Sequence, residues 1–263
     1  MRWNKIYNMD CVLGLKLLDN DCVDLTVTSP PYDGLRIYNG YSFDFELVAK
    51  ELYRVTKNGG IVVWVVGDAV VDGSESLTSF KQAIYFKELG FKVHDTMIYE
   101  KNSLSMPDSN RYYQKFEYMF VFSKGKPETV NLLKDRKNIA ERWGRKFTIY
   151  EKDGSKIKRE RDLHKEEYGV RFNIWKYNTG HGFTSKEELS HPAVFPEKLV
   201  EDHILSWSNK RDVILDPFMG SGTTAKMAII NDRQFIGFEI SNEYCKMANK
   251  RISGLHSQIS FDF

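Results

Sequence analysis

A buried strand, an acidic residue, a glycine-rich turn and the start of a helix follow one another in Val213-Ile214-Leu215-Asp216-Pro217-Phe218-Met219-Gly220-Ser221-Gly222-Thr223-Thr224. In open α/β sheets, ligands bind beyond the carboxyl ends of the strands, which is where such turns lie. Glycine lets the backbone approach a ligand closely because it carries no Cβ atom. The stretch therefore predicts an α/β fold with a ligand pocket at the strand end marked by Asp216.

The glycine-rich turn is not typical of the two common phosphate sites. A P-loop requires a lysine directly after its last glycine, and here Thr223 follows Gly222. The dinucleotide fingerprint requires a third glycine where Ala225 stands. A nucleoside pocket fits better, because Glu239 ends the next apolar run and is placed to accept both hydroxyls of a ribose. Glycines alone are also typical of an ordinary strand–helix turn, but the two acidic strand ends favour the ligand site.

Strand-like runs alternate with amphipathic helix-like stretches on both sides of this turn. The sequence predicts strands at Lys5–Asn8, Val23–Thr28, Ile61–Val66, Val93–Tyr99, Glu117–Ser123, Val213–Leu215 and Phe235–Ile240. It predicts helices at Asp44–Thr56, Leu77–Leu89, Pro196–Ser208, Thr223–Asn231 and Asn242–Ile252. This alternation is typical of a mostly parallel sheet covered on both faces. Val93–Tyr99 and Glu117–Ser123 have no convincing helix between them, so we expect an antiparallel pair at the sheet edge.

The composition is that of a packed globular protein. The chain has 263 residues, of which 41% are hydrophobic, 28% charged and 14% aromatic. This profile argues against a disordered, collagen-like or coiled-coil chain. No apolar run reaches the roughly 20 residues of a bilayer span, and the N-terminal residues lack the apolar stretch of a secretory signal. Three scattered cysteines form no C-x-x-C pair, so we expect a soluble cytoplasmic protein without a cysteine zinc site.

Positive charge is concentrated in one segment. Residues 124–176 contain 16 Lys and Arg but 9 Asp and Glu, a net charge of +7, whereas the rest of the chain has a net charge of −5. The region of about 125–189 also lacks a clean hydrophobic period, so we interpret it as an inserted module. Charge alone fits both a polyanion-binding module and a solvated, lysine-rich surface.

A second motif follows another predicted strand, where Val23–Thr28 runs into Ser29-Pro30-Pro31-Tyr32. Prolines after a buried strand end its hydrogen bonding and hold the backbone rigid. The Ser29 hydroxyl and the Pro30 carbonyl are acceptors, and Tyr32 offers a flat ring for stacking. The motif suits a planar ligand that carries an amino group, and it is also typical of a rigid turn that closes a sheet.

Together the two motifs resemble the β-class S-adenosylmethionine-dependent DNA amino-methyltransferases, in which the catalytic motif precedes the cofactor motif. Ser29-Pro30-Pro31-Tyr32 is similar to the family's catalytic motif of Asp, Asn or Ser followed by Pro-Pro and an aromatic residue, and Asp216–Thr224 matches its cofactor loop. His191–Pro196 resembles the family's segment that packs against the methionine portion of the cofactor, and Phe116–Lys124 resembles its last sheet strand. A weaker match, to the strand end that contacts the adenine, lies at Asn8–Cys11. The resemblance covers about residues 5–124 and 190–252, and the unmatched basic segment is where the family keeps its target-recognition region.

The resemblance implies a Rossmann-like α/β fold: a seven-stranded mixed sheet with circularly permuted motifs and a small basic target-recognition insertion. Residues 1–124 and 190–263 would form the catalytic and cofactor-binding halves, and residues 125–189 the insertion. It implies a catalytic motif at Ser29, Pro30, Pro31 and Tyr32 that works without metal. It implies that the cofactor, S-adenosyl-L-methionine, is bound by Asp10, Thr28, Pro192, Phe195, Asp216, Pro217, Phe218, Gly220, Ser221, Gly222, Thr223, Thr224 and Glu239.

The implied reaction is methyl transfer to an exocyclic amino group of a base flipped out of duplex DNA. Ser29 and the Pro30 carbonyl would accept the amino hydrogens and localise the nitrogen lone pair, while Tyr32 stacks on the base. In the family, Ser at the first position most often accompanies cytosine N4, and Asp or Asn accompanies adenine N6. We therefore expect cytosine N4, with adenine N6 as the alternative.

The resemblance names duplex DNA as the partner, with a homodimer and a restriction endonuclease of the same site as further candidates, and no membrane. Basic side chains would grip phosphate or read bases, since arginine can contact guanine bidentately. The candidates are Arg36, Arg136, Lys137, Arg142, Arg145, Lys146, Lys158, Arg159 and Arg161. Two rival classes stay open: a methyltransferase acting on RNA, protein or a small molecule, and a DNA-binding module without catalysis.

Overall fold

The computed structural model describes residues 1–31, 44–102, 110–138, 146–160, 166–178 and 195–259. The chain divides into a larger unit, Met1–Asn131 with Asn173–Phe263, and a smaller unit, Leu132–Phe172. The smaller unit lies inside the basic segment, and the boundaries expected at residues 125 and 189 stay predictions. No helix in the described part of the chain is long and apolar enough to cross a membrane.

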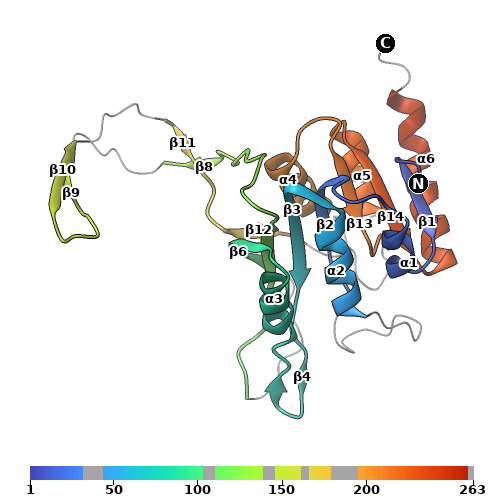
Figure 1. Cartoon of the computed structure of the whole chain (residues 1–263), viewed down its shortest axis with the longest axis horizontal. Coiled ribbons are helices and arrows are strands. Elements are labelled where there is room, and N and C mark those ends of the chain that lie inside the picture. The colour runs from blue at the N-terminus through green and yellow to red at the C-terminus, as the bar shows by residue number, and fades with distance from the viewer. Residues whose placement is uncertain (32–43, 103–109, 139–145, 161–165, 179–194, 260–263) are drawn as a thin grey trace. The chain divides into compact units, whose positions relative to one another are not determined.

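One mixed sheet of eight strands organises the larger unit, in the order β1–β14–β13–β2–β3–β7–β6–β12 (Figure 1). Its strands are β1 Lys5–Asn8, β2 Val23–Thr28, β3 Thr56–Val66, β6 Lys92–Lys101, β7 Phe116–Ser123, β12 Ile174–Tyr177, β13 Val213–Asp216 and β14 Gln234–Glu239, beside a separate hairpin of β4 Val70–Val71 and β5 Ser74–Glu75. Neighbouring strands of the sheet are parallel, except that β7 runs antiparallel to both β3 and β6. The predicted α/β class and the antiparallel pairing of β6 with β7 are confirmed, but the pair does not lie at the sheet edge as expected, because β12 lies outside β6.

The sheet has one strand more than expected, because β12 forms its edge beyond β6. Residues Ile174–Tyr177 belong to the stretch that the sequence assigned to the insertion, yet they pair in parallel with β6. The side chains of β12 alternate in exposure. Trp175 and Tyr177 are 6% and 8% exposed, whereas Ile174 and Lys176 face solvent. A run of four residues inside a basic segment is too short to show this period in the sequence.

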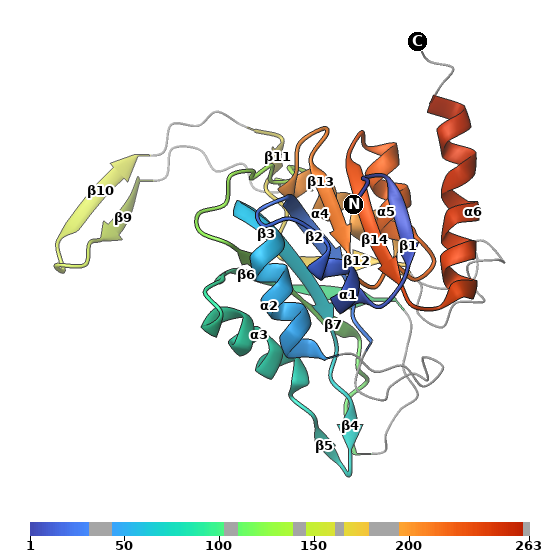
Figure 2. The ribbon, with the colours of Figure 1, turned by 45° about the vertical axis from the view of Figure 1, so that its right-hand side comes forward.

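Helices cover both faces of the sheet. On one face pack α1 Cys11–Lys16, α2 Phe45–Val55 and α3 Thr78–Glu88, and on the other pack α4 Glu197–Trp207, α5 Thr223–Ile230 and α6 Asn242–Ile259 (Figure 2). Because side chains alternate along a strand, Val62, Trp64 and Val66 of β3 all enter the core under α1, α2 and α3. Because helices pack on both faces of the sheet, the ends of the strands are left for a ligand site.

Parallel pairing brings four strand ends together. β13 pairs with β2 and with β14, and β14 pairs with β1, so the carboxyl ends of these strands lie at one edge of the sheet. Thr28, Asp216, Glu239 and Asn8 end β2, β13, β14 and β1. We call this the carboxyl edge. Both motifs singled out in the sequence start here.

Two antiparallel strand pairs form the smaller unit. β8 Arg136–Lys137 pairs with β11 Tyr168–Gly169, and β9 Lys146–Tyr150 pairs with β10 Lys156–Glu160. In the turn between β9 and β10, Gly154 has a φ of +83°, a conformation that costs glycine little. The Asp153 carboxylate accepts the Ser155 amide at 2.9 Å and helps to close this hairpin.

Candidate active site

A buried carboxylate lies at the centre of the carboxyl edge. Asp216, at the end of β13, is 3% exposed. Its Oδ1 accepts hydrogen bonds from the Thr28 hydroxyl at 2.7 Å and from the Phe218 amide at 3.0 Å. Its Oδ2 accepts one from the Thr224 hydroxyl at 2.7 Å. One carboxylate therefore joins the end of β2, the start of the glycine-rich turn and the first turn of α5.

The electrostatics of Asp216 follow from its burial. Loss of water raises the pKa of this carboxyl because burial disfavours the charged form, while the hydrogen bonds from Thr224, Thr28 and Phe218 oppose the rise. A buried carboxylate is tolerated where protein donors replace its water. Both oxygens of Asp216 have such donors, so the side chain is a fixed internal part of the carboxyl edge.

Glu239 ends β14 and faces the same glycine-rich turn. Its Oε2 accepts the Gly220 amide at 2.8 Å, and its Oε1 accepts the Ser241 amide at 2.8 Å. Burial raises the pKa of Glu239 most, the two amide hydrogen bonds lower it, and the charge of Asp216 adds to the rise. The side chain is half-buried, and each carboxylate oxygen has a further lone pair beyond the one that its amide uses. The carboxylate therefore keeps acceptor capacity for a further donor, such as a hydroxyl.

The turn itself has backbone angles that favour glycine. Gly220 and Gly222 have φ values of +51° and +84°. A Cβ atom at Gly222 would lie 2.9 Å from the Ala248 Cβ, so α6 packs directly against the turn. Any larger residue at this position would have to displace the helix.

Three charged side chains that the sequence analysis did not single out hold the glycine-rich turn against the helices: Arg251, Glu197 and Lys226. Arg251 of α6 donates to the Ser221 carbonyl at 3.1 Å and to the Thr223 hydroxyl at 3.0 Å. Glu197 of α4 accepts from Arg251 and from Lys226 of α5, both at 2.5 Å. These contacts join residues 28 to 54 positions apart, so no local sequence pattern could have indicated them.

Asp10 lies beyond the neighbouring strand end. It follows β1 and caps α1, since its side chain accepts the Leu13 amide at 3.0 Å. β1 pairs in parallel with β14, and the register places Asn8 opposite Glu239. The residues expected to contact adenine and ribose therefore start from adjacent strand ends.

The predicted catalytic residues follow directly on β2. Ser29 and Pro31 are half-buried and Pro30 is buried. They come immediately after Thr28, whose hydroxyl is bound by Asp216. Tyr32 lies outside the described residues.

The remaining residues expected to bind the cofactor lie around the turn and at the start of α4. Pro217 is buried, and the half-buried Phe218 ring lies edge-on to Trp64 with 6.2 Å between ring centroids. Phe195 is half-buried and lies two residues before α4. Pro192 lies outside the described residues. The structure thus brings the described members of the predicted set to one edge of the sheet or its adjoining turn and helix.

The basic residues of the smaller unit that were predicted to contact DNA differ in their contacts within the protein. The Arg136 guanidinium lies 4.7 Å from the Phe172 ring centroid and donates to the Val170 carbonyl. Lys137 and Lys158 are exposed, and neither forms an ion pair within the described residues. Lys146 and Arg159 belong to β9 and β10. Outside the described residues lie Arg36, Arg142, Arg145 and Arg161.

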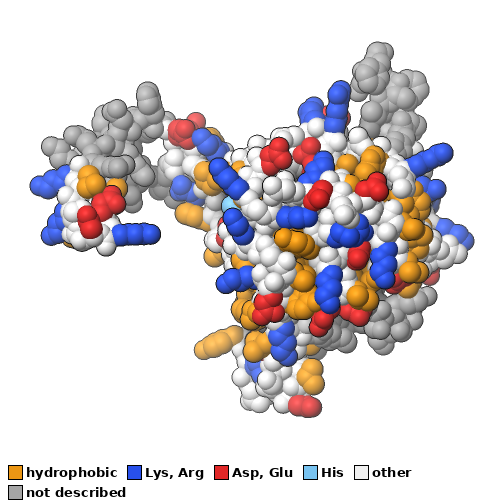
Figure 3. Space-filling model, in the orientation of Figure 1, with side chains coloured by type: hydrophobic (Ala, Val, Ile, Leu, Met, Phe, Trp, Pro, Cys, Tyr) orange, Lys and Arg blue, Asp and Glu red, His pale blue; other side chains and the backbone are white. Residues whose placement is uncertain are grey.

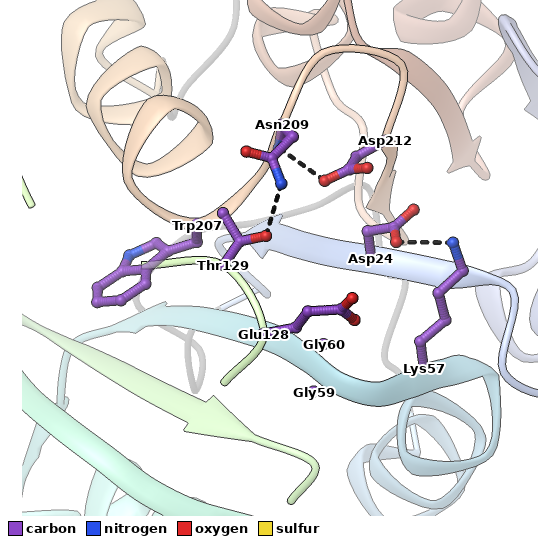
Figure 4. A pocket seen from close by; sticks show the side chains of 9 residues that line it. All are labelled: Asp24, Lys57, Gly59, Gly60, Glu128, Thr129, Trp207, Asn209 and Asp212. Atoms are coloured by element: carbon purple, nitrogen blue, oxygen red, sulfur yellow. Dashed lines mark hydrogen bonds and ion pairs between the residues drawn. The ribbon is translucent and has the colours of Figure 1, made fainter. Parts of the chain in front are cut away.

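A separate pocket of about 290 Å³ lies at the opposite edge of the sheet, at the amino ends of β2, β3 and β13 (Figure 4). Its lining residues are Asp24, Lys57, Gly59, Gly60, Glu128, Thr129, Trp207, Asn209 and Asp212. Several of them bind one another, as Lys57 does to Asp24 at 2.6 Å and Asn209 to Thr129 at 2.9 Å. No residue predicted for catalysis or cofactor binding lines this pocket.

Solved structures share this architecture. The structure described as PvuII DNA methyltransferase, cytosine-N4-specific, matches with a TM-score of 0.69 at 20% identity and covers 97% of this chain and 92% of that one. The complex of M1.HpyAVI with SAM matches with a TM-score of 0.62 at 26% identity and covers 94% and 98%. The fold with its carboxyl edge is therefore that of an S-adenosylmethionine-dependent methyltransferase.

Sequence comparison identifies the family. A family model described as DNA methylase, for N6 and N4 methyltransferases, matches residues 23–250. The orphan methyltransferase M.BamHII of Bacillus amyloliquefaciens is 63% identical over 240 residues, which cover 88% of this chain and 89% of that protein. The chain belongs to the DNA methylase family, as a β-class amino-methyltransferase whose cofactor is S-adenosyl-L-methionine. The resemblance drawn from the two motifs is confirmed, while the homodimer and the restriction endonuclease stay predictions.

Proposed function

We propose that this chain transfers a methyl group from S-adenosyl-L-methionine to the exocyclic N4 of cytosine in duplex DNA, by direct transfer to a flipped base. The observation that carries the proposal is the position of Ser29-Pro30-Pro31 at the carboxyl edge, directly beyond β2 and beside the strand that leads into the glycine-rich turn. The acceptors for the base and the turn for the cofactor therefore start from neighbouring strands.

The catalytic motif acts on the nitrogen of the base. An exocyclic amino nitrogen is a poor nucleophile because its lone pair is delocalised into the ring. The Ser29 hydroxyl and the Pro30 carbonyl accept its hydrogens, which localises the lone pair on nitrogen. Two successive prolines hold these acceptors in place before the base arrives, so little entropy is lost on binding. A base paired in the duplex cannot reach this motif, so it is flipped out and stacks on Tyr32.

The carboxyl edge offers acceptors that suit the cofactor. Glu239 accepts the Gly220 amide of the turn and the Ser241 amide that follows β14, and it keeps acceptor capacity for ribose hydroxyls. Asp10 reaches the adenine from the adjacent strand end, and Phe195 with Pro192 packs against the methionine portion. S-adenosylmethionine supplies a methyl group bonded to a positively charged sulfur. On attack by the amino nitrogen the carbon–sulfur bond would break and leave a neutral thioether, and the methylated nitrogen would give up one proton to solvent. The chain's part is to hold the methyl group and the amino nitrogen in line.

Cytosine is favoured over adenine by Ser29 at the first position of the catalytic motif. The structure of PvuII methyltransferase, which is described as cytosine-N4-specific, supports the same choice by a fold match over nearly the whole chain. The family model covers both N6 and N4 methyltransferases, so adenine N6 is the alternative. The two bases require the same acceptors, and the product decides between them.

The β9–β10 hairpin is the proposed DNA-reading element. In its antiparallel register Lys156 lies opposite Tyr150 and Lys158 opposite Thr148, so these four side chains share one face. All four are exposed, and lysine side chains project from the hairpin (Figure 3). A two-stranded ribbon fits the major groove of B-DNA, and lysines without acidic partners are suited to phosphate.

Product analysis tests this function. The protein is incubated with mixed-sequence duplex DNA and S-adenosylmethionine, the DNA is digested to nucleosides, and the products are identified by mass spectrometry. We expect N4-methylcytosine. N6-methyladenine would support the proposed reaction type but refute the choice of cytosine as the target base. No methylated nucleoside from a protein that binds the cofactor in calorimetry would refute the proposed substrate.

A further inference from the structure

We propose that Asp216, Thr28 and Thr224 form a clamp that positions the catalytic motif against the cofactor turn, and that Asp216 and Thr28 are positioning residues. This assigns them a role different from the cofactor contacts expected from the sequence. The inference rests on the proposed function, because a clamp of this kind matters only if methyl transfer occurs between the two segments it joins.

The geometry of the clamp leaves little room for a ligand. Asp216 is 3% exposed, and Thr28 and Thr224 are 0% exposed. The two threonine hydroxyls donate to opposite oxygens of the carboxylate, each at 2.7 Å. The Phe218 amide takes a second site on Oδ1 at 3.0 Å. A group enclosed to this degree and bonded on both oxygens holds protein segments together and has little surface for a cofactor.

The segments that the clamp joins are the two that must meet in the reaction. Thr28 is the residue directly before Ser29, which would bind the amino group of the base. Phe218 and Thr224 lie on either side of Gly220-Ser221-Gly222, the turn that would approach the cofactor. Direct transfer requires the reacting atoms to be aligned, and a displacement of about 1 Å can slow such a reaction by about 100-fold. The clamp fixes this alignment from inside the protein.

An alternative is that the three residues simply complete the buried hydrogen bonding of the fold. The same strand supplies a matched control for this alternative. Thr26, two residues before Thr28 on β2, is also 0% exposed, but its hydroxyl has no partner in the described structure. Thr26→Val and Thr28→Val make the same chemical change on one strand, and only the second removes a donor from Asp216.

The test measures both the rate of transfer and the affinity for the cofactor. Wild type, Thr28→Val, Thr28→Ser and Thr26→Val are compared by transfer of labelled methyl groups to duplex DNA, which counts product whichever base is modified. For Thr28→Val we expect kcat to fall about 10- to 100-fold, with the Kd and KM for S-adenosylmethionine within about twofold of wild type. Thr28→Ser retains the hydroxyl and should restore most of kcat, and Thr26→Val should match wild type.

Two results would overturn the clamp. Equal kcat values in Thr28→Val and Thr26→Val would show that the bond to Asp216 positions nothing. A parallel loss of kcat and cofactor affinity in Thr28→Val would return Thr28 to the cofactor site. Should Thr28→Val fail to fold, Thr224→Val applies the same comparison to the other carboxylate oxygen. A wild-type protein that methylates no DNA would refute the proposed function and the clamp together, whereas an active wild type with an unaffected Thr28→Val would refute the clamp alone.

Discussion

The charged side chains at the carboxyl edge of the sheet and on the β9–β10 hairpin of the smaller unit differ in burial and in their partners. At the carboxyl edge, Asp216 is enclosed and has protein donors on both oxygens. On the hairpin, Lys156 and Lys158 are exposed, and neither forms an ion pair within the described residues. The Lys156 ammonium lies over the Tyr150 ring, 5.5 Å from its centroid.

This difference matches two physical requirements. Methyl transfer depends on fixed distances, and buried charge-assisted hydrogen bonds supply them because water cannot compete for the donors. Binding of a polyanion depends on cations that can exchange their solvent and counterions for phosphate. A carboxylate with all its donors inside the protein suits the first task, and a lysine without an acidic partner suits the second.

The largest difference between the two regions should appear in stability. Asp216→Ala removes the acceptor for Thr28, Phe218 and Thr224 and leaves their donors buried. Each such group costs about 1–3 kcal/mol, so we expect the free energy of unfolding to fall by about 3 kcal/mol or more. Lys158→Ala should change it by less than about 0.5 kcal/mol, as is usual for an exposed site. Urea unfolding measures both, and a similar loss in the two variants would contradict the comparison.

The next largest effect should be on DNA binding by the hairpin. The double variant Lys156→Gln, Lys158→Gln should weaken binding to duplex DNA about tenfold and reduce the slope of log K against log salt by about 2, or about 0.9 for each lost phosphate contact. Filter binding or fluorescence anisotropy between low and moderate salt gives both numbers.

A matched control for the hairpin variant is Lys81→Gln, Lys87→Gln, which removes the same charge from two exposed positions of α3. We expect this control to retain most of the wild-type affinity and salt slope. If the two double variants lose affinity equally, the effect is one of net charge, and the hairpin has no special role.

A smaller effect should follow the ionisation of Glu239. Its pKa is raised above 4.5, the ordinary value, chiefly by burial. Protonation therefore sets in at a higher pH than for a free carboxyl and removes acceptors that the ribose hydroxyls would use. We expect the affinity for S-adenosylmethionine to fall as the pH is lowered toward 4.5 from above. Glu239→Gln should bind S-adenosylmethionine severalfold more weakly near neutral pH, and its affinity should no longer depend on pH. Calorimetry at several pH values measures both. A wild-type affinity that does not change with pH would contradict this prediction.

Most of the fold followed from local patterns in the sequence. Residues such as Val213, Ile214 and Leu215 form apolar runs ended by glycine or acidic residues, and these runs became the parallel strands. The acidic strand ends at Asp216 and Glu239 were predicted to mark the site, and the structure places them on adjacent strands. Local pattern sufficed here because a buried parallel strand is apolar along its whole length.

Other features could not be predicted because they depend on distant parts of the chain. Arg251 reaches the turn and Glu197 only when α4 and α6 pack beside α5. β12 is a strand only because β6 offers it an edge. The sequence also does not indicate the hydrogen-bond partners of a carboxylate. It predicts Asp216 as a ligand-binding residue at a strand end, and only the structure shows that Thr28 and Thr224 donate to its two oxygens.

The smallest expected effect tests how completely the buried edge satisfies its polar groups. Thr26 lies on β2 among core residues, and its hydroxyl has no partner in the described structure. A buried hydroxyl without a partner is destabilising, and valine has a similar shape and a strong preference for strands. We expect Thr26→Val to raise the free energy of unfolding by about 0.5–1 kcal/mol in urea at an unchanged slope. A loss of stability would instead mean that the hydroxyl binds an ordered water, and water would then have access to the same strand that the Asp216 clamp holds.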